Sequence, residues 1–173
     1  MRVSRSIVAG LIALTLGACG LFEDANRLGV SAEGEGDVRA HFVPCPGQAV
    51  TRVALLSQVG SGVHLETGDD QPGDDPEDDE VVIWSVGAAA GSPETTFQMG
   101  VTPPGFTDEI PLVGRPADHS GIAAFVGYRS ADGGLASLQI GFDIDDLESD
   151  RILTLSDFKD PATFQSDGRA LCE

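Results

Sequence analysis

The sequence predicts an all-β domain, built as an antiparallel β-sandwich, behind an N-terminal export segment. Short apolar runs recur along the 173 residues, and in several of them apolar and polar residues alternate with a period of two. That period places one set of side chains on each face of a β-strand. Clusters of Gly, Pro, Asp and Ser separate the runs and are typical of turns. Strong helical patterns are absent.

Residues 1–18 have the features of an export signal. Arg2 and Arg5 precede Ile7–Leu16, a mostly apolar stretch without a charge, as in a secretory signal peptide. As a helix, this stretch would span about 15 Å, which is roughly half of the ~30 Å hydrocarbon core of a bilayer. We therefore do not expect a permanent transmembrane helix.

The next residues, Leu16-Gly17-Ala18-Cys19, consist of a Leu, two small residues and a Cys. This segment resembles the lipobox of bacterial lipoproteins. The resemblance implies cleavage before Cys19, attachment of a diacylglyceryl group to its thiol, and a lipid anchor at the extracytoplasmic face of the cell membrane. Two or more acyl chains anchor a protein stably. The alternative is an ordinary signal peptide with a Cys near its cleavage site.

The mature chain is expected to consist of a flexible tether, residues 19–37, and one folded domain, residues 38–173. The tether is poor in apolar residues and would hold the domain about 20–25 Å from the membrane. Lipidation of Cys19 leaves Cys45 and Cys172. An exported domain meets an oxidising environment, so these two predict one structural disulfide; the alternative is two free buried thiols.

Six apolar runs that precede the final hairpin are expected to form strands. Ile110–Val113 contains Pro111 and should lie at a sheet edge, and Trp84 is expected in the core. The six runs are Val38–Phe42, Val50–Leu56, Val63–Leu65, Val81–Val86, Thr95–Val101 and Ile110–Val113.

The hairpin has the clearest pattern. Ile122–Arg129 and Ala136–Ile144 flank Asp132-Gly133-Gly134, and the second run alternates over nine residues, as a half-buried strand does. Single helical turns are expected at 145–149 and 160–166. Seven to nine short strands with turn-rich connections predict a sandwich that is immunoglobulin-like in general architecture.

A second similarity lies in the middle of the chain. Trp84 is followed by Phe97-Gln98-Met99-Gly100-Val101 and then by a Pro-x-Gly-Phe segment that ends at Pro111-Leu112. This succession is similar to a segment of uncharacterised secreted actinobacterial proteins. The similarity implies the fold and the lineage, and it implies no activity.

Nucleic acid is not an expected partner. The net charge is −18, and removal of Arg2 and Arg5 with the signal would make it more negative by two. Such a surface repels polyanions.

The densest acidic segment, residues 66–80, contains the candidate ligands for Ca²⁺, which prefers oxygen donors. It does not match an EF-hand, because Asp74 stands where that loop needs Gly. A solvated, self-repelling loop is the interpretation we favour. The candidates for weak binding are Asp69, Asp70, Asp74, Asp75, Asp78, Asp79 and Glu80.

No catalytic motif emerges from the remaining residues. His41, His64 and His119 are scattered, and no G-x-S-x-G elbow is present. Ser156 and Lys159 match a Ser-x-x-Lys pattern, but the motifs that accompany it in serine acyl-transfer enzymes are missing. The acidic cluster at 143–150 could in principle supply paired carboxylates for a glycosidase, but the aromatic residues that usually line a sugar cleft are scarce, since the chain has one Trp and one Tyr.

We therefore expect a non-catalytic binding or structural module without a cofactor. Its expected partners are the membrane, through the lipid anchor, and another envelope protein or a cell-wall component. The alternatives are a hydrolase of envelope polymers, and a Ca²⁺-dependent binding module that uses the acidic loop.

Overall fold

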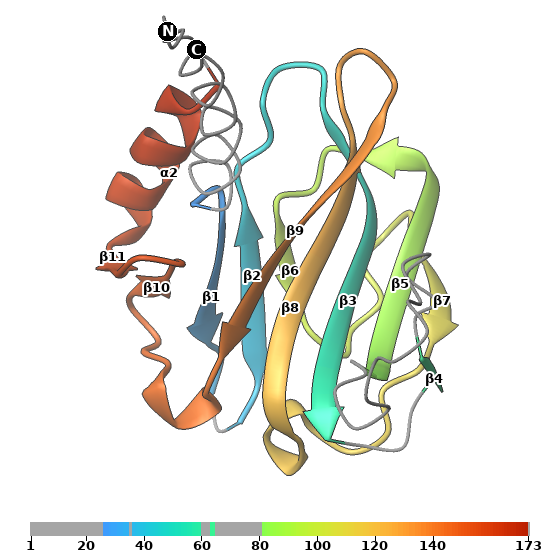
Figure 1. The fold of residues 1–173 in the computed structure, drawn as a ribbon, viewed down its shortest axis with the longest axis vertical. Coiled ribbons are helices and arrows are strands. Elements are labelled where there is room, and N and C mark those ends of the chain that lie inside the picture. The colour runs from blue at the N-terminus through green and yellow to red at the C-terminus, as the bar shows by residue number, and fades with distance from the viewer. Residues whose placement is uncertain (1–25, 35, 60–62, 65–80, 173) are drawn as a thin grey trace, which may run out of the picture.

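The computed structural model describes residues 26–34, 36–59, 63–64 and 81–172. Two antiparallel sheets pack face to face (Figure 1), so the predicted β-sandwich is confirmed. The first sheet has the order β11 (Phe158–Lys159), β10 (Ile152–Leu153), β1 (Leu28–Ala32), β2 (Val38–Phe42) and β6 (Thr96–Gln98). The second has the order β4 (Val63–His64), β5 (Val81–Ser92), β3 (Ala49–Val59), β8 (Ser120–Arg129) and β9 (Leu135–Phe142), and β7 (Thr107–Ile110) also pairs with β5.

The core lies between the sheets. Alternate residues of each strand point inward, as Val53 and Leu55 do in β3 and Ala124 and Val126 do in β8. Trp84 of β5 is only 1% exposed, as expected for the core. Each large apolar side chain buried in this way contributes about 1.5–3 kcal/mol.

The predicted hairpin between β8 and β9 is confirmed. The amide of Gly133 donates to Ser130 O at 2.9 Å, and the amide of Ser130 donates to Gly134 O at 2.8 Å. Gly133 has φ +90°, so this is a three-residue loop with a left-handed residue before the second strand. Asp132 supports the turn by accepting from the Gly134 amide.

The N-terminal boundary of the domain differs from the expected one. β1 lies between β10 and β2 in the first sheet, and Leu28 and Val30 are fully buried. The prediction of a tether over residues 19–37 is therefore wrong for this segment, and the domain begins before Val38. β1 has only five residues, so its alternation of inward and outward side chains is too short to be recognised in the sequence.

The C-terminal helix is longer than the single turn expected at 160–166. α2 spans Pro161–Ala170. Asp160 caps it, because its carboxylate accepts from the amides of Ala162 and Thr163, and Pro161 is favourable at the first helical position. Phe164 is fully buried against Val43 and Ile152, so α2 covers the outer face of the first sheet (Figure 1).

Smaller shifts occur in the middle of the chain. β6 is shorter than the expected strand over 95–101, because the chain turns at Gly100, whose φ is +83°. The strand expected at Ile110–Val113 is displaced, since β7 ends at Ile110 and residues 111–113 are outside any strand; Pro111 has no amide to donate to a neighbouring strand. Among the described strands β7 pairs only with β5, at a sheet edge. Besides α2, the described residues form two short 3₁₀ turns, η1 (Pro116–Asp118) and η2 (Ile144–Asp146).

Candidate functional site

A small polar cleft lies on the outer face of the first sheet, where the segment after β9 crosses the β1–β2 hairpin. Its volume is about 190 Å³, and its walls come from four parts of the chain. It is lined by Ser31, Ala32, Glu33, Arg39, His41, Ser149, Asp150, Arg151, Ile152 and Pro161. We take this cleft as the candidate site because Ser, His and Arg side chains meet there.

The strand alternation aims these side chains outward. Leu28 and Val30 point into the core from β1, so Ser31 points to the opposite face. In β2, Val38, Ala40 and Phe42 point inward, which leaves Arg39 and His41 outside. The register pairs Ser31 with Arg39 and Gly29 with His41, and the side chains of Ser31 and His41 meet diagonally across the two strands.

Ser31 and His41 form a hydrogen bond at the floor of the cleft. Ser31 Oγ lies 2.9 Å from His41 Nε2, and the His41 ring meets Phe164 edge to face at 6.3 Å. Burial, together with the nearby Arg39 guanidinium, lowers the pKa of His41 from 6.5 to about 4. His41 is therefore neutral at pH 7 and a weak base there. The pair is better suited to hydrogen bonding than to abstracting a proton.

Glu33, Arg39 and Arg151 of the cleft have partners of opposite sign. Arg39 forms an ion pair with Glu33. Arg151 lies 3.6 Å from Glu148, donates to Phe158 O at 2.8 Å and sits over the Phe158 ring. Within the described parts of the chain, no group of three or more His, Cys, Asp or Glu residues is arranged to hold a metal ion. The Ser31–His41 pair and the ion-paired side chains offer hydrogen-bonding groups at the cleft.

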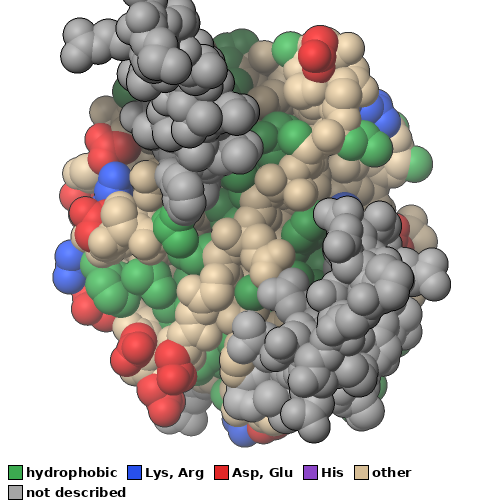
Figure 2. Space-filling model, viewed as in Figure 1, with side chains coloured by type: hydrophobic (Ala, Val, Ile, Leu, Met, Phe, Trp, Pro, Cys, Tyr) green, Lys and Arg blue, Asp and Glu red, His purple; other side chains and the backbone are tan. Residues whose placement is uncertain are grey.

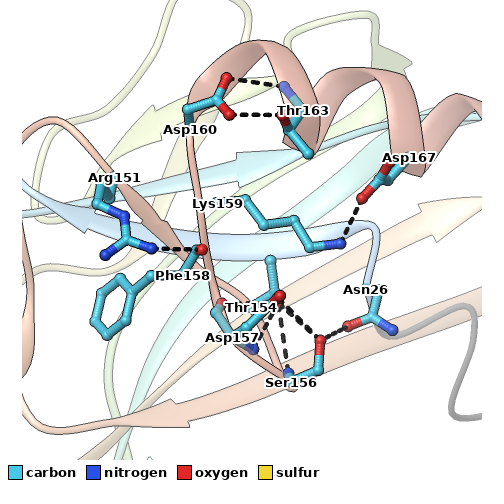
Figure 3. A network of polar contacts seen from close by, with 10 residues as sticks. All are labelled: Asn26, Arg151, Thr154, Ser156, Asp157, Phe158, Lys159, Asp160, Thr163 and Asp167. Atoms are coloured by element: carbon cyan, nitrogen blue, oxygen red, sulfur yellow. Dashed lines mark hydrogen bonds and ion pairs between the residues drawn. The ribbon is translucent and has the colours of Figure 1, made fainter.

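One wall of the cleft is held by the polar network of Figure 3. Thr154 is buried, and its hydroxyl donates to Asp157 O and also contacts Asp157 Oδ1. Ser156 Oγ donates to Asn26 Oδ1 at 3.3 Å, and Lys159 donates to Asp167 of α2 at 2.7 Å. These contacts fasten β10, β11 and α2 to one another and to the start of the domain.

The same network contains both residues of the Ser-x-x-Lys pattern, Ser156 and Lys159. Ser156 bonds to Asn26 and Asp157, whereas Lys159 bonds to Asp167. The serine and the lysine therefore have separate partners, and the pattern does not form a nucleophile–base pair.

Arg27 is a buried residue that the sequence did not single out. Its guanidinium lies 5.6 Å from the centre of the Phe42 ring and 5.4 Å from that of Tyr128. It donates to Val43 O, to Gln48 Oε1 at 2.8 Å and to the Tyr128 hydroxyl at 3.1 Å. Arg27 thus joins the start of β1 to both sheets. No local pattern could reveal this, because its partners lie far away in the sequence.

The predicted disulfide is confirmed. Cys45 and Cys172 are bonded, with their Cα atoms 5.3 Å apart and a sequence separation of 127. The bond joins the β2–β3 connection to the second residue beyond α2. It does not cross between the sheets, so the arrangement of antibody domains is not reproduced, as the sequence suggested.

The other sequence-predicted residues are dispersed or undescribed. Cys19 and the Ca²⁺ candidates between Asp69 and Glu80 lie outside the described residues, as does the side chain of His64. His119 contacts Val113 O at 3.3 Å in the loop before β8. In the second acidic cluster, Asp143 caps η2 by accepting from the amide of Asp145. Ser31 was missed, since a lone Ser in a five-residue strand carries no recognisable signal.

No protein-family model, curated protein or solved structure matches this chain. The lipobox resemblance and the similarity to secreted actinobacterial proteins stay predictions. A function for this fold has to be argued from its site and its covalent chemistry.

Proposed function

We propose that this protein is a lipid-anchored surface protein at the extracytoplasmic face of the cell membrane, with a non-catalytic binding or structural domain. The observation that carries the proposal is the Cys45–Cys172 disulfide. The chain has three cysteines, so this pairing leaves Cys19, which stands at the position of the modified Cys in the lipobox pattern. A disulfide also suits an exported domain, because the cytosol keeps thiols reduced.

The strongly negative charge of the chain favours a covalent anchor over attachment through the protein surface. No described helix is long and apolar enough to cross a bilayer. Lipid chains would provide membrane attachment without such a helix, and the strongly negative charge argues against attachment through the protein surface to anionic lipid or nucleic acid.

Binding is favoured over catalysis by the state of the Ser31–His41 pair. A serine nucleophile needs a base with a pKa near the working pH, and that base is usually oriented by a third group. The pKa of His41 lies near 4, and among the described residues no carboxylate hydrogen-bonds to its ring. The expected ligand is part of another envelope protein or of the cell wall.

Metabolic labelling with an alkyne-bearing palmitate tests the anchor. The wild-type chain should incorporate the label, fractionate with membranes and show the mass of a chain that begins at lipidated Cys19. Cys19→Ala should lose both the label and the membrane association. Cys45→Ala is the matched control, because it removes a different cysteine and should keep the label. Labelled Cys19→Ala protein would contradict the proposal.

The hydrolase of envelope polymers remains the second candidate, and the Ser31–His41 hydrogen bond is the observation that favours it. A fluorophosphonate probe distinguishes the two functions, because it modifies activated serines only. We expect no labelling at pH 7. Labelling that disappears in Ser31→Ala would establish the hydrolase instead.

A further inference from the structure

We propose that the Cys45–Cys172 disulfide is a site of thiol–disulfide exchange with a fixed direction, in which an incoming thiolate attacks Cys172 and Cys45 leaves as a thiolate held by Arg27. Cys172 then carries the incoming thiol compound, so it is assigned as a modification site. The inference goes beyond the proposed function and holds whether or not Cys19 carries lipid.

The disulfide borders a hollow at the surface of the domain. The hollow has a volume of about 490 Å³ and is lined by Pro44, Cys45, Pro46, Arg169 and Cys172. Both cysteines are half-buried, so a small thiol can reach the bond between them. A disulfide enclosed in the core would be inert to such a thiol, because exchange requires access to a sulfur atom.

The surroundings of Cys45 stabilise a negative charge on its sulfur. Arg27 Nη1 lies 3.1 Å from Cys45 Sγ, and Arg27 is only 1% exposed, so water weakens this contact little. Gln48 holds both groups in place, since its Oε1 accepts from Arg27 Nη1 and from the Cys45 amide, each at 2.8 Å. A cation beside a cysteine favours the thiolate over the thiol.

Cys172 lies in surroundings that disfavour a thiolate. It follows the C-terminal end of α2, where the helix dipole is negative, and its Sγ lies 3.6 Å from the carbonyl oxygen of Gly168. The Arg169 side chain is exposed, so solvent screens its charge. Within the described part of the chain, the Arg169 guanidinium forms no hydrogen bond with either sulfur.

This asymmetry sets the direction of exchange, because the sulfur with the more stable thiolate leaves faster and the other sulfur is attacked. The incoming thiol first loses its proton to water. Its sulfur bonds to Cys172 Sγ as the Cys45–Cys172 bond breaks, and the electron pair of that bond stays on Cys45 Sγ. A second thiolate can then attack the incoming sulfur, which releases Cys172 as a thiolate and oxidises the two incoming thiols to a disulfide. Exchange therefore also opens the covalent link between α2 and the β2–β3 connection.

Early trapping of the mixed disulfide tests the direction. Any free thiol of the full chain is first blocked with N-ethylmaleimide, and the folded protein is then exposed briefly to 2-mercaptoethanol, acidified and alkylated. This neutral thiol is the probe because the chain has a net charge of −18 and would repel an anionic thiol; Figure 2 shows acidic side chains at several places on one face. Peptide mass spectrometry then locates the attached group.

We expect 2-mercaptoethanol on Cys172 about ten times as often as on Cys45. Equal amounts on the two cysteines, or an excess on Cys45, would overturn the direction of attack. Exchange that takes place only in denaturant would overturn the proposal as a whole, because the disulfide would then be shielded in the folded domain.

Variants of Arg27 separate its role from the effect of access. Arg27→Met removes the buried cation, so the ratio should fall toward one, whereas Arg27→Lys keeps a cation and should keep most of the preference. Arg169→Met is the matched control, because it removes an exposed cation that lines the same hollow and should leave the ratio unchanged. Trp84 fluorescence shows whether each variant is folded.

An unchanged preference for Cys172 in folded Arg27→Met protein would overturn the role assigned to Arg27. If Arg27→Met does not fold, the ratio in the wild type still decides the direction of attack, and loss of the preference in folded Arg27→Lys protein would count against the role of the positive charge.

Discussion

Removal of the Cys45–Cys172 disulfide should lower the stability of the domain substantially. The double variant Cys45→Ser/Cys172→Ser leaves no reactive thiol in the domain. A serine hydroxyl at position 45 also keeps an acceptor near Arg27 Nη1, which lies 3.1 Å from Cys45 Sγ. The substitution therefore removes the covalent link and disturbs the buried guanidinium little.

The magnitude follows from the size of the closed loop. A sequence separation of 127 residues corresponds to about 5 kcal/mol in the chain-entropy model. We take that value as an upper limit, because we expect α2 to leave the first sheet before the rest of the domain unfolds. The apolar contacts that α2 makes there centre on Phe164, whose burial contributes only about 1.5–3 kcal/mol. We expect a loss of about 3–5 kcal/mol.

Guanidinium unfolding followed by two signals measures this loss. Trp84 is the only Trp and lies in the core between the sheets, so its fluorescence reports on the sandwich, while far-UV circular dichroism includes α2. The guanidinium concentration at the unfolding midpoint should be lower for the double variant than for the wild type. In the variant, the circular dichroism signal of α2 should be lost at a lower guanidinium concentration than the Trp84 fluorescence signal. Reductant should shift the wild type to the same midpoint and leave the double variant unchanged. Equal midpoints for the oxidised wild type and the variant would refute the reasoning.

Three further substitutions test individual contacts. Gly29→Ala should destabilise the domain by about 1–3 kcal/mol, because its methyl group would lie 2.4 Å from Ile152 Cγ2 and 2.8 Å from Leu153 O; an unchanged urea midpoint would contradict this. Asp160→Ala should cost about 1 kcal/mol by removing the cap of α2, whereas Asp160→Asn, which keeps an acceptor, should cost less. His41 has a folded-state pKa near 4, below its ordinary 6.5, so the unfolded chain binds the proton more readily between these values. Stability should therefore fall by up to about 3 kcal/mol as the pH falls from 6.5 to 4, and His41→Gln should lack this part of the pH dependence in urea titrations.

Much of the sandwich could be predicted because strand alternation is a local signal. Leu138 and Ile140 of β9 are buried and their neighbours Ser137 and Gln139 are exposed, as the period of two requires. The hairpin at Gly133 was predictable for a similar reason, since few residues other than Gly adopt a positive φ. The disulfide followed from counting cysteines.

β1 and the full length of α2 could not be predicted from local sequence patterns. β1 is five residues long, and its Gly29 is there because β10 and Phe164 approach its backbone closely. α2 contains Thr, Ser and Gly, which are modest or poor helix formers. The helix depends on the Asp160 cap, the burial of Phe164 and the disulfide, which hold it against the first sheet.

The candidate cleft could not be predicted at all. Ser31 and His41 are ten residues apart, on strands joined by a turn, and the opposite wall comes from residues 149–161. The pKa of His41 is set by the burial of its ring and by the nearby Arg39 guanidinium. Neither feature can be read from the sequence.

The sequence by itself determined the strand-rich class of the domain, the pairing of two cysteines and the export and lipidation pattern that we propose to be functional. These features depend on residue type and on spacing over a few positions. Only the tertiary structure decided that residues 28–32 form an inner strand, that α2 closes one face of the sandwich, and that Ser31 meets His41. Those outcomes depend on contacts between segments far apart in the chain. A local sequence pattern does not specify which of these distant segments will pack together and bury their apolar surfaces.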